Sequence, residues 1–147
     1  MKGIYILVVS VGIDIRIAVG SLGSVFFDKG LYAYIGSAQN HLEKRIQRHL
    51  RKDKRMFWHI DYLLESDSVE VMGFFRKEAS KSEECRVAGE LLKVAVPVVD
   101  FGSSDCRCMS HLFRFGDSLA QIFSMLDCIG TRCSGFSFSY CSSILQD

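Results

Sequence analysis

Residues 3–36 read GIYILVVSVGIDIRIAVGSLGSVFFDKGLYAYIG, and this stretch decides the expected fold. The continuous apolar run at 3–9 predicts a central buried strand. Apolar residues then alternate with other residues over 11–19, which is typical of a half-buried strand. Glycine-containing turns separate two further short strands, the last of which ends at Gly36. We therefore expect an antiparallel meander in which residues 11–27 form an inserted hairpin.

Helical signals dominate the middle of the chain. Leu42, Ile46 and Leu50 recur every four residues, so they predict a helix over 41–52 with Asn40 as its N-cap. Further expected elements are a helix at 57–64, a strand at 69–75, a helix from a capping box at 80–83 to about 94, a strand at 111–115 and a helix at 118–126. Together these elements predict an α+β fold, a small central antiparallel sheet flanked by helices.

Composition favours one globular unit. The 147 residues are 48% hydrophobic and 24% charged, with a single proline, which excludes a disordered or fibrous chain. We expect a domain at 1–116 and a C-terminal part at 117–147. That part is a helix followed, from 127, by an irregular Ser/Cys-rich tail or interaction segment.

The sequence also bears on membrane association and on the cellular compartment. No apolar run approaches the roughly 18 residues of a membrane span, and we expect no membrane association. The N-terminal apolar run lacks a signal-type cleavage site. We therefore expect a cytoplasmic protein whose cysteines are free thiols or metal ligands.

Positive charge is concentrated in residues 41–55. Seven Lys and Arg there face two Asp and Glu, a net +5 in a chain of net +1. Such a block is either an ordinary solvated face or a polyanion site, and we favour contact with nucleic acid. The residues we assign to that contact are Arg48, Arg51, Lys52, Lys54 and Arg55.

Two tripeptides and a helix carry the strongest functional signal. Gly3-Ile4-Tyr5 and Tyr34-Ile35-Gly36 lie on apolar strands, and Arg45 and His49 follow four residues apart on the basic helix. With these residues, the chain resembles the GIY-YIG nuclease superfamily. It is most similar to a little-characterised branch with a long hairpin between the tripeptides and stretches like WHIDYLL (58–64) and FGSSDCRCMSHLF (101–113).

The resemblance implies hydrolysis of phosphodiester bonds with one divalent metal ion. For the substrate we favour DNA over RNA, with DNA repair as the setting. It implies that Tyr5 helps to activate the attacking water, that Tyr34 helps to position it, and that Arg45 binds the phosphate. Tyr5, Tyr34, Arg45 and His49 are expected to line one concave face as catalytic residues.

A glutamate is expected to hold Mg²⁺ or Mn²⁺. The best match to the family is Glu84, although Glu83 and Glu90 lie on the same helix. Independently of the resemblance, Glu84 lies three residues before Val87 on an apolar helix stripe. A carboxylate there is costly unless it is paired or metal-bound. A capping or surface role for Glu84 is the alternative.

Simpler roles compete for several residues. Tyr5 and Tyr34 could be core aromatics, and Phe57 and Trp58 are better explained by packing than by base stacking. Cys106, Cys108 and His111 form a C-x-C-x-x-H pattern to which Cys85 could add a fourth ligand. This set could bind Zn²⁺ or consist of buried free thiols.

Three functions follow. The first is a metal-dependent endonuclease. The second is a non-catalytic nucleic-acid-binding module with a decayed site, and the third is a protein-interaction domain that self-associates through its tail. The first two differ by geometry. The enzyme requires Glu84 to share a cleft with Tyr5 and Arg45, and the module is favoured if the hairpin at 11–27 fills that cleft.

Overall fold

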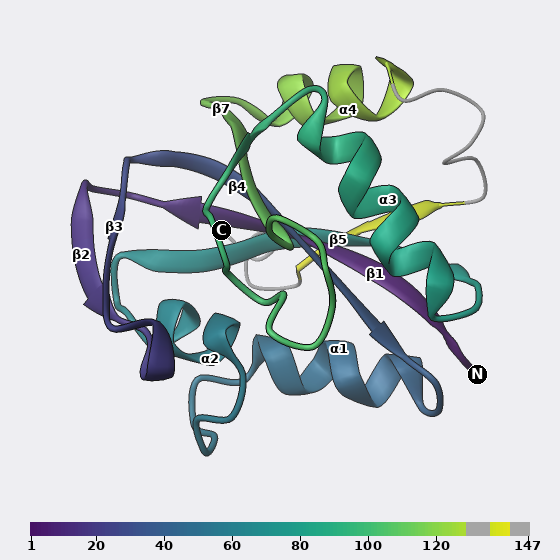
Figure 1. Cartoon of the computed structure of the whole chain (residues 1–147), viewed down its shortest axis with the longest axis horizontal. Coiled ribbons are helices and arrows are strands. Elements are labelled where there is room, and N and C mark those ends of the chain that lie inside the picture. The colour runs from purple at the N-terminus through teal and green to yellow at the C-terminus, as the bar shows by residue number, and fades with distance from the viewer. Residues whose placement is uncertain (129–135, 142–147) are drawn as a thin grey trace.

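The architecture is built on an antiparallel sheet with β1 at its centre (Figure 1). The computed structural model describes residues 1–128 and 136–141. Within them, this sheet has six strands in the order β6-β7-β4-β1-β5-β8. The strands are β1 (Gly3–Val11), β4 (Gly30–Ala38), β5 (Val69–Glu78), β6 (Val96–Pro97), β7 (Leu112–Gly116) and β8 (Ser137–Tyr140). The expected α+β class with a central antiparallel sheet is confirmed.

Helices cover both faces of the sheet, which explains why β1 is apolar over residues 3–9. Tyr5 and Leu7 face one core, and Ile4 and Ile6 face the other. The helices are α1 (Leu42–Leu50) and α2 (His59–Leu64) on the Tyr5 face, and α3 (Ser82–Leu92) and α4 (Leu119–Cys128) on the opposite face (Figure 1). A strand buried on both sides has no polar face to alternate with.

The inserted hairpin is a separate two-stranded sheet. β2 (Ile15–Ala18) pairs with β3 (Ser24–Phe27), and a short 3₁₀ turn, η1 (Gly20–Leu22), joins them. The expected strand over 11–19 is too long, because the chain turns a corner after β1. There, Gly12 donates its N–H to the Ser68 carbonyl. The hairpin packs onto the core on the Tyr5 face.

Two expected helix caps do not form. His41, not Asn40, occupies the N-cap of α1, with φ of 55°. The Leu42 N–H donates to the Met1 carbonyl, so the N-terminus of the chain takes the place of a side-chain cap. At α3 the helix begins at Ser82, and in the described structure no side chain caps it. The Ser80 hydroxyl bonds to the Ser82 hydroxyl instead, at 2.9 Å.

The C-terminal part departs from the expected irregular tail. β8 adds a strand to the edge of the sheet, antiparallel to β5. Phe138 on β8 packs against Phe75 and Phe123, with ring centroids 4.6 and 5.3 Å apart. The remainder of the expected tail, at 129–135 and 142–147, lies outside the described residues. Among the described residues, none of the helices has the length and apolar character needed to cross a bilayer.

Candidate functional site

An open cleft of about 770 Å³ lies on the Tyr5 side of the sheet. Strands β1 and β4 form its floor, and α1, the start of α2, the start of α3 and the segment between β6 and β7 surround it. We name that segment, residues 98–111, the cysteine loop. The lining residues that matter below are Tyr5, Tyr34, Gly36, Ser37, Arg45, Phe57, Trp58, His59, Lys81, Glu84, Gly102 and Asp105. The hairpin contributes Gly20 and Ser21 to the lining, so it borders the cleft without filling it.

Strand pairing brings the two tyrosines together. In the β1–β4 register Tyr5 lies opposite Gly36, and Tyr34 lies opposite Leu7. The Tyr5 ring crosses directly over Gly36, where a Cβ atom would lie 2.5 Å from the Tyr5 Cζ atom. Only glycine leaves that space. Gly36 of the second tripeptide is therefore required for the Tyr5 ring of the first tripeptide to pack over β4.

His49 lies behind Tyr5. The Tyr5 hydroxyl and His49 Nε2 are 2.7 Å apart, and both side chains are about 2% exposed. Burial lowers the pKa of His49 to about 3. Burial also raises the pKa of Tyr5 above its usual value, although Arg45 opposes that shift. Both groups are consequently neutral at pH 7. Among the described residues, His49 Nδ1 has no hydrogen-bond partner.

The expectation that His49 lines the concave face therefore needs correction. Tyr5, Tyr34 and Arg45 line the cleft in the described structure, whereas His49 does not. It lies beneath the floor, hydrogen-bonded to one residue that does. The four-residue spacing predicts that Arg45 and His49 share a face of α1. In the structure Arg45 lies at the wall of the cleft, whereas His49 is buried behind Tyr5.

Arg45 is held at the wall of the cleft by α1. Its guanidinium stacks on the Trp58 ring at 4.5 Å from the ring centroid, and it donates to the Ser37 carbonyl at 3.2 Å. Arg48 stacks on the same ring at 4.4 Å. Trp58 thus packs as expected. A guanidinium has five N–H donors, so stacking leaves Arg45 able to bind an anion in the cleft.

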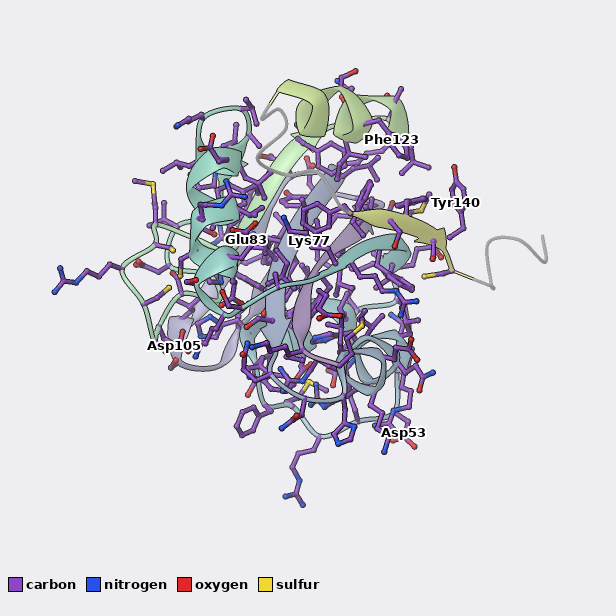
Figure 2. All side chains as sticks on the ribbon, turned by 90° about the vertical axis from the view of Figure 1, so that its right-hand side faces the viewer. Asp53, Lys77, Glu83, Asp105, Phe123 and Tyr140 are labelled. Carbon is purple, nitrogen blue, oxygen red and sulfur yellow. The ribbon has the colours of Figure 1, made fainter. Side chains whose placement is uncertain are left out.

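Among the three glutamates of α3, it is Glu84 that lines the cleft. Glu83 is paired with Arg86 and with Lys77, the latter at 2.7 Å, and Figure 2 shows Lys77 and Glu83 side by side. Glu90 pairs with Lys93. Burial and the charge of Asp105 raise the pKa of Glu84 to about 7, against the opposing effects of Lys81, Ser37 and Arg45.

The basic block separates into two groups. Arg48 forms a bidentate ion pair with Asp61, both contacts at 3.0 Å. Lys52 donates to three backbone carbonyls, those of Leu64, Ser66 and Val69. Lys54 donates to the carbonyls that end α1, those of Arg48, His49 and Arg51.

Arg51 and Arg55 form the second group. Both side chains are exposed. In the described part of the chain neither side chain has a hydrogen bond or ion pair, although the backbone carbonyls of these residues accept from Lys54 and Arg48. In the described structure, none of the five residues that the sequence predicts to contact nucleic acid lines the cleft. The geometry leaves Arg51 and Arg55 free for a polyanion and commits Arg48, Lys52 and Lys54 to the fold.

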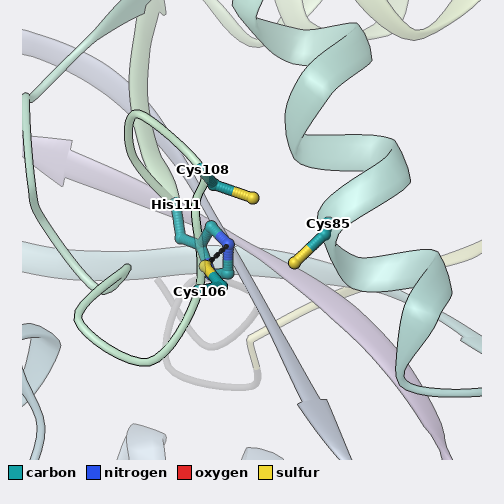
Figure 3. A group of neighbouring side chains, drawn as sticks. All are labelled: Cys85, Cys106, Cys108 and His111. Atoms are coloured by element: carbon teal, nitrogen blue, oxygen red, sulfur yellow. Dashed lines mark hydrogen bonds between the residues drawn. The ribbon is translucent and has the colours of Figure 1, made fainter.

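A cluster of thiols and one imidazole lies beside the cleft (Figure 3). We name it the Cys/His cluster; its members are Cys85, Cys106, Cys108 and His111. Each offers one ligand atom, and these atoms all lie within 4.8 Å of one another. Cys85 comes from α3 and the other three from the cysteine loop. Such a cluster is suited to a metal ion.

Glu84 connects the cluster to the cleft. Its Oε2 atom lies 3.8 Å from His111 Nδ1, while the other ring nitrogen, Nε2, lies 3.5 Å from Cys106 Sγ. The His111 side chain is 3% exposed and the Glu84 side chain 13%. His111 thus presents one nitrogen to the thiols and the other to the carboxylate.

Several lining residues were missed by sequence reasoning. Lys81 lies one helical turn before Glu84, and that spacing could have placed it on the same face. Asp105 lies in the cysteine loop, beside the first turn of α3 (Figure 2). Phe57 was expected to pack, but it precedes α2 and is 74% exposed at the cleft. The His59 ring accepts the Gly102 N–H at 2.9 Å and so joins α2 to the cysteine loop.

Comparison with known proteins places the chain in a family. Neither a curated protein nor a solved structure matches it. The sequence does match the family described as a domain of unknown function, DUF123, over residues 4–131. The match includes every strand and helix that forms the cleft, as well as the Cys/His cluster. The chain belongs to the DUF123 family.

Proposed function

We propose that the cleft hydrolyses phosphodiester bonds of nucleic acid, with the help of a divalent cation. One observation carries the proposal: Tyr5, Arg45 and Glu84, from β1, α1 and α3, line a single cleft together with Tyr34. The resemblance to GIY-YIG nucleases assigned these same residues to one site. A cleft that contains a guanidinium, two phenols and a carboxyl group with a raised pKa is a candidate site for this chemistry.

Arg45 is the proposed phosphate-binding group. A phosphodiester is anionic and repels an attacking oxygen, and a guanidinium can donate to two phosphate oxygens at once. Stacking on Trp58 restrains Arg45 before substrate arrives. Binding therefore requires little reorganisation of its side chain.

Tyr5 and His49 are the proposed route for the proton of the attacking water. In this route the Tyr5 hydroxyl, 2.7 Å from His49 Nε2, donates its proton to the neutral imidazole, and the phenol oxygen accepts from the water. As the water oxygen forms its bond to phosphorus, its proton passes to the Tyr5 oxygen and the Tyr5 proton passes to His49, while the bond between phosphorus and the leaving ester oxygen breaks. The leaving oxygen takes a proton from solvent, and His49 returns its proton to solvent through Tyr5. Tyr34 borders the same space and positions the water.

Glu84 and Asp105 fit a divalent cation such as Mg²⁺ or Mn²⁺. Two carboxylates face the same cleft, and their mutual repulsion contributes to the raised pKa of Glu84. A bound cation would relieve that repulsion and, when bound, neutralise charge that develops on the phosphate oxygens. The thiol-rich Cys/His cluster suits a softer ion, Zn²⁺.

The proposed substrate is DNA, with Arg51 and Arg55 as exposed contacts to its backbone. Phe57, exposed at the cleft, is suited to stack on an unpaired base. Stacking there would favour nicked, branched or single-stranded DNA over intact duplex, which is consistent with a role in repair.

The test is a cleavage assay on duplex, nicked and branched DNA with Mg²⁺ or Mn²⁺. Wild type is compared with Glu84→Gln and with Glu43→Gln, which alters an exposed carboxylate outside the described cleft lining. We expect metal-dependent cutting that Glu84→Gln lowers by about a hundredfold or more and Glu43→Gln leaves unchanged. Equal cutting by both variants would overturn the assignment of Glu84.

A second candidate is a nucleic-acid-binding module without catalysis. Burial raises the pKa values of both Tyr5 and Tyr34, which favours neutral phenols that bind rather than react. In the same assay the module predicts salt-sensitive DNA binding with no cutting by wild type under either metal.

A further inference from the structure

We propose that the Cys/His cluster binds one Zn²⁺ ion in a closed tetrahedral site, and that this ion fixes the cysteine loop to α3. The proposal does not depend on hydrolysis in the cleft. It concerns how one wall of the cleft is held, and it gives Glu84 a second role, in positioning His111.

The ligand set selects zinc. Three thiols and an imidazole form a Cys₃His set, which is a common structural zinc site, and soft sulfur ligands disfavour Mg²⁺ and Ca²⁺. All four positions of a tetrahedron come from the protein, so no position is left for substrate or reactive water. The site is therefore structural rather than catalytic.

The ligand atoms are close enough together for a zinc tetrahedron to form with small side-chain shifts. Zinc–sulfur bonds of about 2.3 Å and zinc–nitrogen bonds of about 2.0 Å imply ligand atoms about 3.5–3.8 Å apart. The Cys106 Sγ to His111 Nε2 distance is 3.5 Å, and all ligand atoms lie within 4.8 Å of one another. The sulfur atoms of Cys85 and Cys108 approach each other across the gap between helix and loop (Figure 3).

Free thiols or a disulfide explain the arrangement less well. A core that needs only small apolar side chains gains nothing from three thiols with an imidazole nitrogen directed at one of them. A disulfide would join two cysteines and leave the third and His111 unexplained. Cys141, by contrast, is buried outside the cluster and serves as an ordinary free thiol.

Glu84 completes the site from outside. Ligating histidines usually donate their second ring N–H to a carboxylate or carbonyl, which fixes the tautomer and strengthens the ligand. With Nε2 toward the thiols, His111 directs Nδ1 toward the Glu84 carboxylate, 3.8 Å away. The two groups would need to close to hydrogen-bond distance when the metal binds. Glu84 is thus a positioning residue for a zinc ligand.

The ion would hold two parts of the cleft wall together. The cysteine loop supplies Gly102 and Asp105 to the cleft, and α3 supplies Lys81 and Glu84. Within the described residues, the Lys81–Asp105 ion pair also joins them, at 4.0 Å with side chains 65% and 74% exposed. An exposed pair at that distance contributes little. Zinc would supply the firm connection.

The first test is metal analysis of the purified full chain. We expect one zinc per chain in wild type and in the control Cys141→Ser, and none above background in Cys108→Ser. Because the loss of Cys108 can also destabilise the chain, Co²⁺ is titrated in addition into chelator-treated wild type. Stoichiometric thiolate-to-cobalt charge-transfer bands with intense tetrahedral d–d bands support the site. Zinc-free wild type that lacks those bands overturns it.

The second test concerns Glu84. Zinc affinity is measured by competition with a chromophoric chelator, a readout independent of DNA cleavage. We expect Glu84→Gln to keep the stoichiometry but to bind zinc about 10–100-fold more weakly, because outer-shell partners of ligating histidines have effects of that size. Glu43→Gln is the matched control. Equal zinc affinity in both variants would overturn the positioning role.

Discussion

At the scale of single residues, the Tyr5–His49 hydrogen bond joins the candidate chemistry to the stability of the fold. It is buried and spans 44 residues of sequence. The pair lies where α1 meets the floor of the cleft, so a change in either residue affects both the packing of α1 and the cleft.

Replacement of Tyr5 by Phe tests the structural part of that role. His49 would lose its hydrogen-bond partner at Nε2 while Nδ1 already has none among the described residues. We expect the free energy of unfolding to fall by about 1–3 kcal/mol, because a buried polar group is left unsatisfied. Denaturant unfolding measures it, with Tyr62→Phe as a control at another cleft tyrosine. Equal losses of unfolding free energy in Tyr5→Phe and Tyr62→Phe would contradict a stabilising role for the Tyr5–His49 hydrogen bond.

His49 also predicts a pH dependence of stability. Its pKa is about 3 in the fold and about 6.5 when unfolded. The unfolded chain therefore binds the proton first, so the contribution is fully present above pH 6.5 and is lost as the pH falls toward 3. The loss is about 1.4 kcal/mol per pH unit in that window.

The matched variant is His49→Gln, which can still accept from Tyr5 and does not titrate. We expect the stability difference between wild type and His49→Gln to shrink as the pH is lowered from 7 to 5, as measured by urea unfolding. A difference that stays constant over that range would show that His49 is not held neutral by burial.

At the scale of elements, the basic segment after α1 contains two kinds of cationic side chain. One kind stabilises the fold and the other is exposed to solvent, and the sequence does not distinguish them. Lys52 and Lys54 bind backbone carbonyls, whereas Arg51 and Arg55 are exposed. Charge counting finds the block. Only the fold, which brings the carbonyls of residues 64–69 beside this segment, shows which of its cationic side chains form hydrogen bonds within the protein.

Alanine substitutions distinguish the side chains that stabilise the fold from those proposed to contact DNA. We expect Lys52→Ala to lower the free energy of unfolding by about 1–3 kcal/mol, because three carbonyls lose a charged donor. We expect Arg51→Ala to change stability by less than about 0.5 kcal/mol but to weaken DNA binding and to reduce its salt slope by about one. Chemical denaturation and salt-dependent binding titrations measure these effects. The reverse pattern would refute the division.

Elements with a strong local pattern were predictable, and those that depend on distant partners were not. The apolar run of β1 and the four-residue spacing in α1 predicted a strand and a helix close to where they lie. β8 is a short segment rich in Ser and aromatic residues, and it becomes a strand because the edge of β5 is available to pair with it. The capping box at Ser80 failed because Glu83 is engaged by Lys77 and Arg86 instead.

At the scale of the whole molecule, the cleft is a product of topology. β1 and β4 pair so that the two tyrosines meet, α1 supplies Arg45, and α3 reaches the same cleft from across the sheet edge with Glu84. The resemblance named these residues. Sequence alone could not place His49 beneath the floor or add Asp105 and Lys81, because those positions depend on how loops and helices pack.

The Cys/His cluster illustrates the same limit. The C-x-C-x-x-H pattern is local and was visible in the sequence, whereas the proximity of Cys85 depends on α3 packing beside the cysteine loop. Glu84 lines the cleft and lies 3.8 Å from His111 of the cluster, so one carboxylate lies between the proposed structural ion and the proposed catalytic ion.

The most direct test of the hydrolase proposal measures binding and cutting of one branched DNA in the same sample, for wild type and Tyr5→Phe, with Mg²⁺ or Mn²⁺. Circular dichroism confirms that both are folded at the assay temperature. We predict that Tyr5→Phe binds within about threefold of wild type but cuts at least about a hundredfold more slowly, since it lacks the hydroxyl that accepts the water proton. Wild type that binds without cutting, or Tyr5→Phe that cuts at the wild-type rate, would contradict the proposed function.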